Sequence, residues 1–92
     1  MISGRILVVD DEPQIHRFLG PALSAAGYEP LRAERGDDAL RQAASAAPDL
    51  VLLDLGLPDI DGQEVLRRLR AFSDVPVIIL SARDQEAQKI AA

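Results

Sequence analysis

Two short apolar runs, each stopped by an acid, constrain this chain more than any other feature of its sequence. Residues 6–9 read Ile-Leu-Val-Val and precede Asp10 and Asp11, and residues 50–53 read Leu-Val-Leu-Leu and precede Asp54. Uninterrupted and partly β-branched runs of this length are typical of strands buried on both faces in a parallel sheet. The sequence therefore predicts a covered parallel sheet with acids at the ends of two strands.

Segments with helical patterns separate the predicted strands. Apolar residues recur at spacings of three and four from Pro13 until near Gly27, which predicts one helix with an apolar face. We expect that face to consist of Ile15, Phe18, Leu19, Ala22, Leu23 and Ala26. Further helices are predicted over residues 36–47, from Asp61 onward with Glu64 completing an acidic capping box, and from Asp84 onward.

Two weaker strands complete the pattern. Residues 28–33 contain Pro30, which cannot donate to a ladder, so we expect this strand at an edge of the sheet that Tyr28 covers. Residues 75–80 read Val-Pro-Val-Ile-Ile-Leu and predict a fourth strand that ends at Ser81. The alternation of strands and helices predicts an α/β fold with helices on both faces of the sheet and right-handed crossovers.

Acids and a hydroxyl group are predicted to converge where the strands end. Ligands of open α/β sheets bind outside the carboxyl ends of the strands, which here carry Asp10, Asp11, Asp54 and Ser81. Carboxylates that lie close together repel one another unless they take up a proton or bind a cation. Mg²⁺, with Mn²⁺ as an alternative, suits these oxygen ligands, whereas a chain with no cysteine and one histidine offers little to zinc.

A carboxylate beside such a cation can act as a nucleophile toward a phosphoryl group, and Asp54 is the candidate. Gly56 would let the loop turn close to the cation and offer its carbonyl oxygen. Ser81 could hydrogen-bond a phosphoryl oxygen and so link the fourth strand to the modification. We interpret Asp59 and Asp61 as turn and cap residues rather than as ligands.

Charge, the first apolar run, the single histidine and the turn after the first strand argue against several other classes of function. A formal net charge of -5 argues against nucleic-acid binding by this chain itself. The first apolar run is too short for a secretion signal or a membrane span, so we expect a cytoplasmic chain without membrane contact. The lone His16 is interpreted as an exposed or packed helix residue rather than a phosphohistidine. Acids in place of a Gly-rich turn after the first strand argue against a nucleotide-binding Rossmann domain.

Three segments of the sequence resemble the receiver domains of two-component response regulators, and the resemblance runs through essentially the whole chain. They are Val-Asp-Asp-Glu at 9–12, Asp-Leu-Val-Leu-Leu-Asp-Leu-Gly-Leu-Pro-Asp-Ile-Asp-Gly at 49–62 and Val-Pro-Val-Ile-Ile-Leu-Ser-Ala at 75–82. Among receivers, the chain looks most like regulators of the winged-helix transcription-factor class, including those of potassium-transport systems. The resemblance implies a flavodoxin-like doubly wound parallel sheet with the strand order 2-1-3-4.

The resemblance also implies a role for each candidate residue. Asp54 would be phosphorylated by a partner sensor histidine kinase. Asp11, Asp54 and the carbonyl group of Gly56 would bind Mg²⁺ directly, Asp10 would act through water, and Ser81 would be the switch hydroxyl. Such a domain is a phosphoacceptor rather than an enzyme, and it would regulate an output domain, of DNA-binding type, that these 92 residues do not include.

One part of the family pattern is missing. The family places a lysine at the end of a fifth strand, followed by a fifth helix, whereas Lys89, the single lysine, falls in the predicted fourth helix. We therefore expect residues 1–92 to form one receiver domain that is incomplete at its C-terminus and has no phosphate-pairing lysine. An exposed edge strand and a bare sheet face would favour self-association or exchange of elements between chains.

Two other functions remain open at this point. The same acids would suit a magnesium-dependent phosphatase with an aspartyl-phosphate intermediate, although residues 54–56 lack the Asp-x-Asp signature of one such superfamily. The absent lysine and fifth strand would instead suit an interaction module that cannot be phosphorylated.

Overall fold

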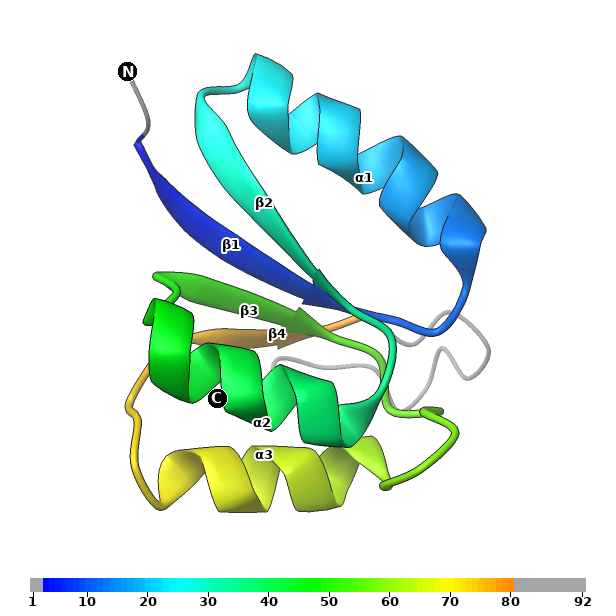
Figure 1. Ribbon diagram of the computed structural model, residues 1–92, viewed down its shortest axis with the longest axis vertical. Coiled ribbons are helices and arrows are strands. Elements are labelled where there is room, and N and C mark those ends of the chain that lie inside the picture. The colour runs from blue at the N-terminus through cyan, green and yellow to red at the C-terminus, as the bar shows by residue number, and fades with distance from the viewer. Residues whose placement is uncertain (1–2, 81–92) are drawn as a thin grey trace.

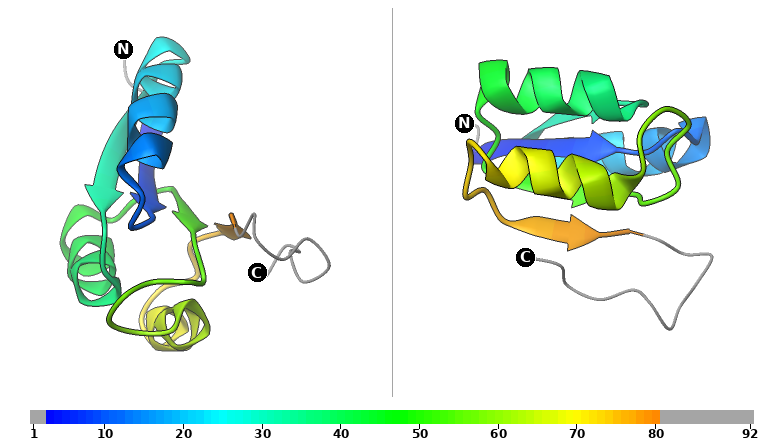
Figure 2. Two further views of the ribbon diagram at one scale, coloured as in Figure 1. Left: turned by 90° about the vertical axis from the view of Figure 1, so that its right-hand side faces the viewer. Right: turned by 90° about the horizontal axis from the view of Figure 1, so that it is seen from below.

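The computed structural model describes residues 3–80, in which strands and helices alternate. Their order is β1 (Gly4–Val9), α1 (Pro13–Ala25), β2 (Tyr28–Ala33), α2 (Gly36–Ala46), β3 (Leu50–Leu53), α3 (Gly62–Arg70) and β4 (Val77–Ile79). The strands form one parallel sheet in the order β2-β1-β3-β4. Helix α1 covers one face of the sheet, and α2 and α3 cover the other (Figures 1 and 2). The predicted fold and strand order are confirmed.

The two acid-terminated runs occupy the middle of the sheet. All four residues of the run at 6–9 are buried, because β1 lies between β2 and β3 and is covered on both faces. The main core lies between the sheet and the pair α2 and α3. Its buried members are Leu7, Val9, Ala33, Ala39, Ala43, Val51, Leu53, Val65, Leu69 and Val77. Helices α2 and α3 are therefore fixed against the same strands whose ends carry the acids.

The opposite face of the sheet is less completely covered. Leu52 of β3 is half-buried, and Ile78 of β4 is 41% exposed. At the far edge, β2 pairs only with β1 within the described residues, which confirms the edge position predicted from Pro30. Tyr28 at the start of β2 is 39% exposed. Among residues 3–80, no helix has the length and apolar character needed to cross a membrane.

Strand β4 is shorter than the sequence predicts. The strand expected over residues 75–80 comprises only Val77–Ile79. Pro76 cannot donate to the ladder, and the N–H of Val75 donates to the side chain of Ser73 at 3.1 Å instead. The turn that follows α3 therefore takes the first two residues of the predicted strand. Helix α2 likewise ends at residue 46, one residue before its predicted end.

Helix α1 buries a different face from the one that its apolar pattern predicts. Phe18, expected to face the sheet, is 71% exposed, while Leu19 and Leu23 are half-buried. The only fully buried side chain described in the helix is that of His16. The apolar face predicted for α1 is therefore partly wrong, and the packed alternative for His16 is the right one. The helix also ends at Ala25, slightly before its predicted end.

Helix α3 begins with the predicted cap but not with the reciprocal capping box. The carboxylate of Asp61 accepts the N–H of Gln63 at 2.8 Å, which satisfies one of the free donors at the start of the helix. The carboxylate of Glu64 does not turn back to the N-cap; it accepts hydrogen bonds from the side chains of Arg67 at 3.0 Å and Arg68 at 2.8 Å. These hydrogen bonds and the two positive charges lower the pKa of Glu64 to about 2.

Candidate functional site at the strand ends

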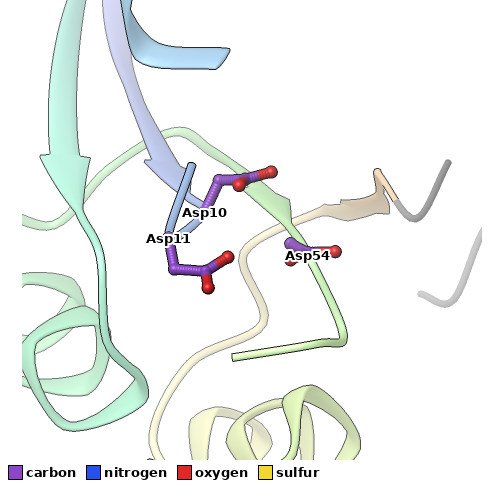
Figure 3. Close-up of side chains that lie close together, drawn as sticks. All are labelled: Asp10, Asp11 and Asp54. Carbon is purple, nitrogen blue, oxygen red and sulfur yellow. The ribbon is translucent and has the colours of Figure 1, made fainter. Parts of the chain in front are cut away.

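Three carboxyl groups gather where β1 and β3 end (Figure 3). Backbone hydrogen bonds continue past both strands and place two of the acids. The N–H of Asp10 donates to the carbonyl group of Ala33 at 3.0 Å, and the N–H of Asp54 donates to that of Val9 at 2.9 Å. Since β1 and β3 are adjacent and parallel, the residues that follow them leave the sheet at the same edge.

The three acids form a compact cluster. One carboxylate oxygen from each of Asp10, Asp11 and Asp54 lies within 4.8 Å of the other two. Asp10 and Asp54 are each 5% exposed, whereas Asp11 is exposed. Oδ1 of Asp10 also accepts the N–H of Glu12 at 2.8 Å, which tightens the turn from β1 into α1. The cluster therefore has two buried acids and one that faces solvent.

The electrostatics of the cluster favour a cation. Burial raises the pKa of Asp10; the N–H of Glu12 opposes this, and the negative charges of Asp54, Asp11 and Glu12 raise the pKa further. The net effect places that pKa above its ordinary value. A divalent cation between the carboxylates would offset both the burial and the repulsion. Carboxylate oxygens are the ligands that Mg²⁺ prefers, so the residues present fit this ion.

The structure thus brings together Asp10, Asp11 and Asp54, as the sequence predicts. Gly56 lies exposed in the loop that follows Asp54, and its role as a carbonyl ligand stays a prediction. Ser81 lies outside the described residues, as do Lys89 and the helix predicted from Asp84.

His16 adds a contact to this site that sequence reasoning missed. Its ring Nε2 lies 2.7 Å from the carbonyl oxygen of Asp10, and its side chain belongs to the buried part of α1. The ring nitrogen is therefore the donor to this carbonyl group. The signal available in the sequence was the position of the histidine in the first turn of the helix that directly follows the acids.

Asp59 is predicted to be a turn residue, but its side chain accepts hydrogen bonds from a helix that lies far from it in the sequence. Its two carboxylate oxygens accept the N–H groups of Gly36 at 2.7 Å and of Asp37 at 3.0 Å, both in the first turn of α2. Asp59 is therefore a cap, but for the preceding helix rather than for α3. No local motif in the sequence marks this pairing, because 22 or 23 residues separate the partners.

A parallel sheet in this order, with three acids at the ends of its two central strands, defines a receiver-type domain. The response regulator receiver domain family matches residues 6–92, and the chain belongs to that family. The resemblance seen in the sequence is confirmed.

The relatives that the chain resembles include transcriptional regulatory proteins. The chain is 53% identical over 87 residues to the KDP operon transcriptional regulatory protein KdpE of Escherichia coli strain K12, an alignment that covers 95% of this chain and 39% of that protein. The chain thus spans well under half the length of that relative.

Two solved structures have the same fold and more than 30% sequence identity to this chain. The BeF3-activated receiver domain of RstA from Klebsiella pneumoniae is 34% identical with a TM-score of 0.82, and the match covers 87% of this chain and 68% of that one. A chain in the crystal structure of histidine kinase ThkA with response regulator protein TrrA is 41% identical with a TM-score of 0.83, covering 97% of this chain and 76% of that one.

Proposed function

We propose that this chain is the phosphoryl-accepting switch of a two-component response regulator, with Asp54 as the phosphoacceptor. The observation that carries the proposal is the cluster of three acids within 4.8 Å at the ends of the two central strands of a receiver fold. The ThkA–TrrA structure holds a response regulator and a histidine kinase together, which supports a histidine kinase as the phosphoryl donor.

In the proposed reaction a carboxylate oxygen of Asp54 attacks the phosphorus atom of a phosphohistidine. A new O–P bond forms while the N–P bond breaks, and the imidazole nitrogen takes back the bonding electron pair. Bound Mg²⁺ would neutralise the charge on the transferred oxygens. Asp11 and Asp54, with the Gly56 carbonyl group, would hold the ion directly, and Asp10 would do so through water.

The backbone of this chain gives the nucleophile a fixed position. The N–H of Asp54 is bonded to the Val9 carbonyl group at 2.9 Å, and the residue is 5% exposed. The main chain of Asp54 is thereby held at the end of the strand, so a donor that reaches this point meets a nucleophile whose backbone position is fixed. Phosphorylation would then increase the negative charge at the end of β3, where Ser81 as the switch hydroxyl would respond to it.

The output of the switch is proposed to be transcription. The name of the Escherichia coli relative, a transcriptional regulatory protein, supports this. The formal net charge of -5 makes this chain itself a poor partner for DNA, so DNA contact would come from another part of the response regulator.

The test is covalent labelling of the 92-residue chain with a small phosphodonor, acetyl phosphate, in the presence of Mg²⁺. Intact mass should show one added phosphoryl group, which Asp54→Asn and chelation of Mg²⁺ should both abolish. Asp49→Asn is the matched control, because Asp49 is an exposed acid just before β3 and should leave labelling unchanged. Absence of labelling in the unsubstituted chain, or labelling that survives Asp54→Asn, would overturn the proposal.

Three earlier expectations stay predictions. Absence of phosphoryl labelling in the 92-residue chain would favour the interaction module that cannot be phosphorylated. Steady turnover of a phosphoester substrate would revive the phosphatase alternative. Self-association of the chain is to be checked by light scattering, in which a stable monomer with cooperative unfolding would contradict it.

A further inference from the structure

The loop after the phosphoacceptor is fastened to a helix that precedes it in the chain. Asp59 lies in that loop, between β3 and α3, and its oxygens accept the N–H groups of Gly36 at 2.7 Å and Asp37 at 3.0 Å. Its side chain is only 12% exposed, and Nη2 of Arg35 lies 3.9 Å from Oδ2. The side chain thus packs against the start of α2, while residue 59 as a whole stays exposed.

Helix α2 depends on this distant carboxylate for its cap. Its N-cap residue, Arg35, provides no side-chain cap among residues 3–80. The first N–H groups of a helix have no partner within the helix, and an anionic acceptor is favoured there by the helix dipole. The side chain of Asp37 accepts the N–H of Asp38, whereas the N–H groups of Gly36 and Asp37 find their acceptors on Asp59, in the loop.

The contact leaves no spare room. A Cβ atom at Gly36 would lie 2.8 Å from Cγ2 of Val65 and 3.0 Å from Cβ of Ile60. These distances are shorter than normal contacts, so only glycine lets the start of α2 approach the loop and α3 this closely. Gly36 allows the start of α2 to come close to the loop, and Asp59 binds the helix start at that same point.

The other end of the same loop is fixed as well. The N–H of Gly62 donates to the carbonyl group of Leu55 at 3.0 Å. A Cβ atom at Gly62 would lie 2.5 Å from Cα of Leu55 and 2.8 Å from the carbonyl oxygen of Asp54. The start of α3 is therefore packed directly on the backbone of the phosphoacceptor. Residues 56–58, which include Gly56, lie between Leu55, which contacts Gly62, and Asp59, which binds α2.

We infer that Asp59 is a positioning residue of the phosphoacceptor site. By fastening the loop to α2 it holds the backbone of Gly56 in place for a divalent cation at the acid cluster, without touching the cation or the phosphoryl group itself. The inference rests on the proposed function, since it concerns the cation that the acids would hold. It differs from a plain capping role in one respect, namely that the affinity of the folded chain for the cation depends on Asp59.

The test measures Mg²⁺ affinity rather than stability alone. Mg²⁺ is titrated into the 92-residue chain and into Asp59→Ala and Asp59→Asn, and binding is followed by the NMR shifts of the backbone amides of Asp10 and Asp54, at a temperature where each chain is folded. We expect Asp59→Ala to weaken Mg²⁺ binding about tenfold, as is usual when an outer-shell support is removed. Asp59→Asn retains an acceptor oxygen and should lose less.

Asp49→Ala is the matched control for loss of a capping-type contact. Oδ2 of Asp49 accepts the N–H of Arg5 at 2.8 Å, at the opposite end of the sheet from the acids. This variant should unfold more easily while its Mg²⁺ affinity stays at the unsubstituted value. Gly36→Ala provides a second route, because it pushes the loop away while Asp59 remains, and it should weaken Mg²⁺ binding in the same direction.

The outcomes separate the two proposals. An unsubstituted chain that binds no Mg²⁺ would overturn the proposed function, and this inference with it. A chain that binds Mg²⁺ equally well with alanine at residue 59 or at residue 36 would leave the proposed function standing and overturn the positioning role. If Asp59→Ala does not fold, unchanged Mg²⁺ affinity in Asp59→Asn and Gly36→Ala would have the same meaning.

Discussion

The buried ring of His16 donates a hydrogen bond of 2.7 Å from Nε2 to the carbonyl oxygen of Asp10, and so ties helix α1 to the acid cluster. Asp10 is itself 5% exposed, so water has little access to this carbonyl group. Together with the bond from the N–H of Glu12 to the side chain of Asp10, it fixes the turn from β1 into α1 at two points. The orientation of the first acid thus depends on a residue of the following helix.

Replacing His16 by leucine should therefore destabilise the domain although it makes the helix more apolar. The carbonyl group of Asp10 would lose its ring donor, and such a loss at a buried polar group costs about 1–3 kcal/mol. Urea unfolding followed by circular dichroism measures the change. Gln14→Leu on the exposed side of the same turn is the control and should change stability little. A His16→Leu chain as stable as the unsubstituted one would show that this bond contributes nothing.

The raised pKa of Asp10 predicts a stability that falls as pH rises. Burial and the neighbouring negative charges raise this pKa above its ordinary value of 3.8 in the folded chain, so folding favours the protonated form. Ionised Asp10 lowers the free energy of unfolding. This loss of stability is absent below the unfolded-state pKa of Asp10 and complete above its folded-state pKa. Without divalent cations, Asp10→Asn should thus be more stable than the unsubstituted chain at neutral pH, with the difference disappearing in acid.

The measurement is urea unfolding across this pH range, with and without Mg²⁺. Mg²⁺ should stabilise the unsubstituted chain more than Asp10→Asn, because the ion offsets the charge that the variant lacks. Asp11→Asn, at an exposed position, is the matched control and should gain less stability. An Asp10→Asn chain that is less stable than the unsubstituted one at neutral pH without cations would contradict the prediction.

Local sequence patterns were enough to predict the two central strands, the acids at their ends and the edge strand. Two apolar runs stopped by acids predict the central strands, and adjacent parallel strands leave little freedom in where Asp10 and Asp54 lie. Pro30 predicts an edge strand for the equally local reason that it has no N–H to donate. The core of the candidate site follows from these features before any packing is known.

Contacts between distant segments could not be predicted in this way. An apolarity pattern favours burial of Phe18 over His16, but it takes no account of the carbonyl group of Asp10, which needs a donor at that point of the helix surface. Asp59 carries no sign that its partners lie in another helix, since only the folded sheet brings the loop beside α2. The same dependence on packing, together with Pro76, shortened β4 relative to its apolar run.

Alanine should destabilise the chain at Gly62 and have a much smaller effect at Gly20, although both glycines lie in helices. At Gly62 the new methyl group would lie 2.5 Å from the backbone of Leu55, and overpacking of this kind costs about 1–3 kcal/mol. At Gly20, inside α1, the methyl group would meet no atom within 4 Å outside its chain neighbours and its own helix backbone. Alanine in a helix interior is favoured over glycine by about 0.5–1 kcal/mol. Pro21 follows directly and crowds a Cβ atom at residue 20, which reduces this gain. Urea unfolding of both variants checks the pair. Equal effects at the two positions would mean that α3 does not pack tightly on the loop.

The carboxylate of Asp59 makes a pH-dependent contribution with the opposite sign to that of Asp10. Although burial raises its pKa, the N–H groups of Asp37 and Gly36 lower it more, so the folded-state pKa lies well below the ordinary value of 3.8. A lowered carboxyl pKa stabilises the fold above the unfolded-state pKa, and this stability is lost as pH falls through the folded-state pKa.

Asp59→Ala should therefore cost about 1 kcal/mol at neutral pH, the usual effect of removing a helix cap, and progressively less in acid. Asp59→Asn separates charge from hydrogen bonding, because the amide keeps one acceptor oxygen but cannot titrate. Its stability difference from the unsubstituted chain should decline in acid, where the native carboxyl group becomes neutral too. A difference that stays constant down to strongly acid pH would show that α2 does not depend on the negative charge at residue 59, and that the loop is fastened by its hydrogen bonds alone.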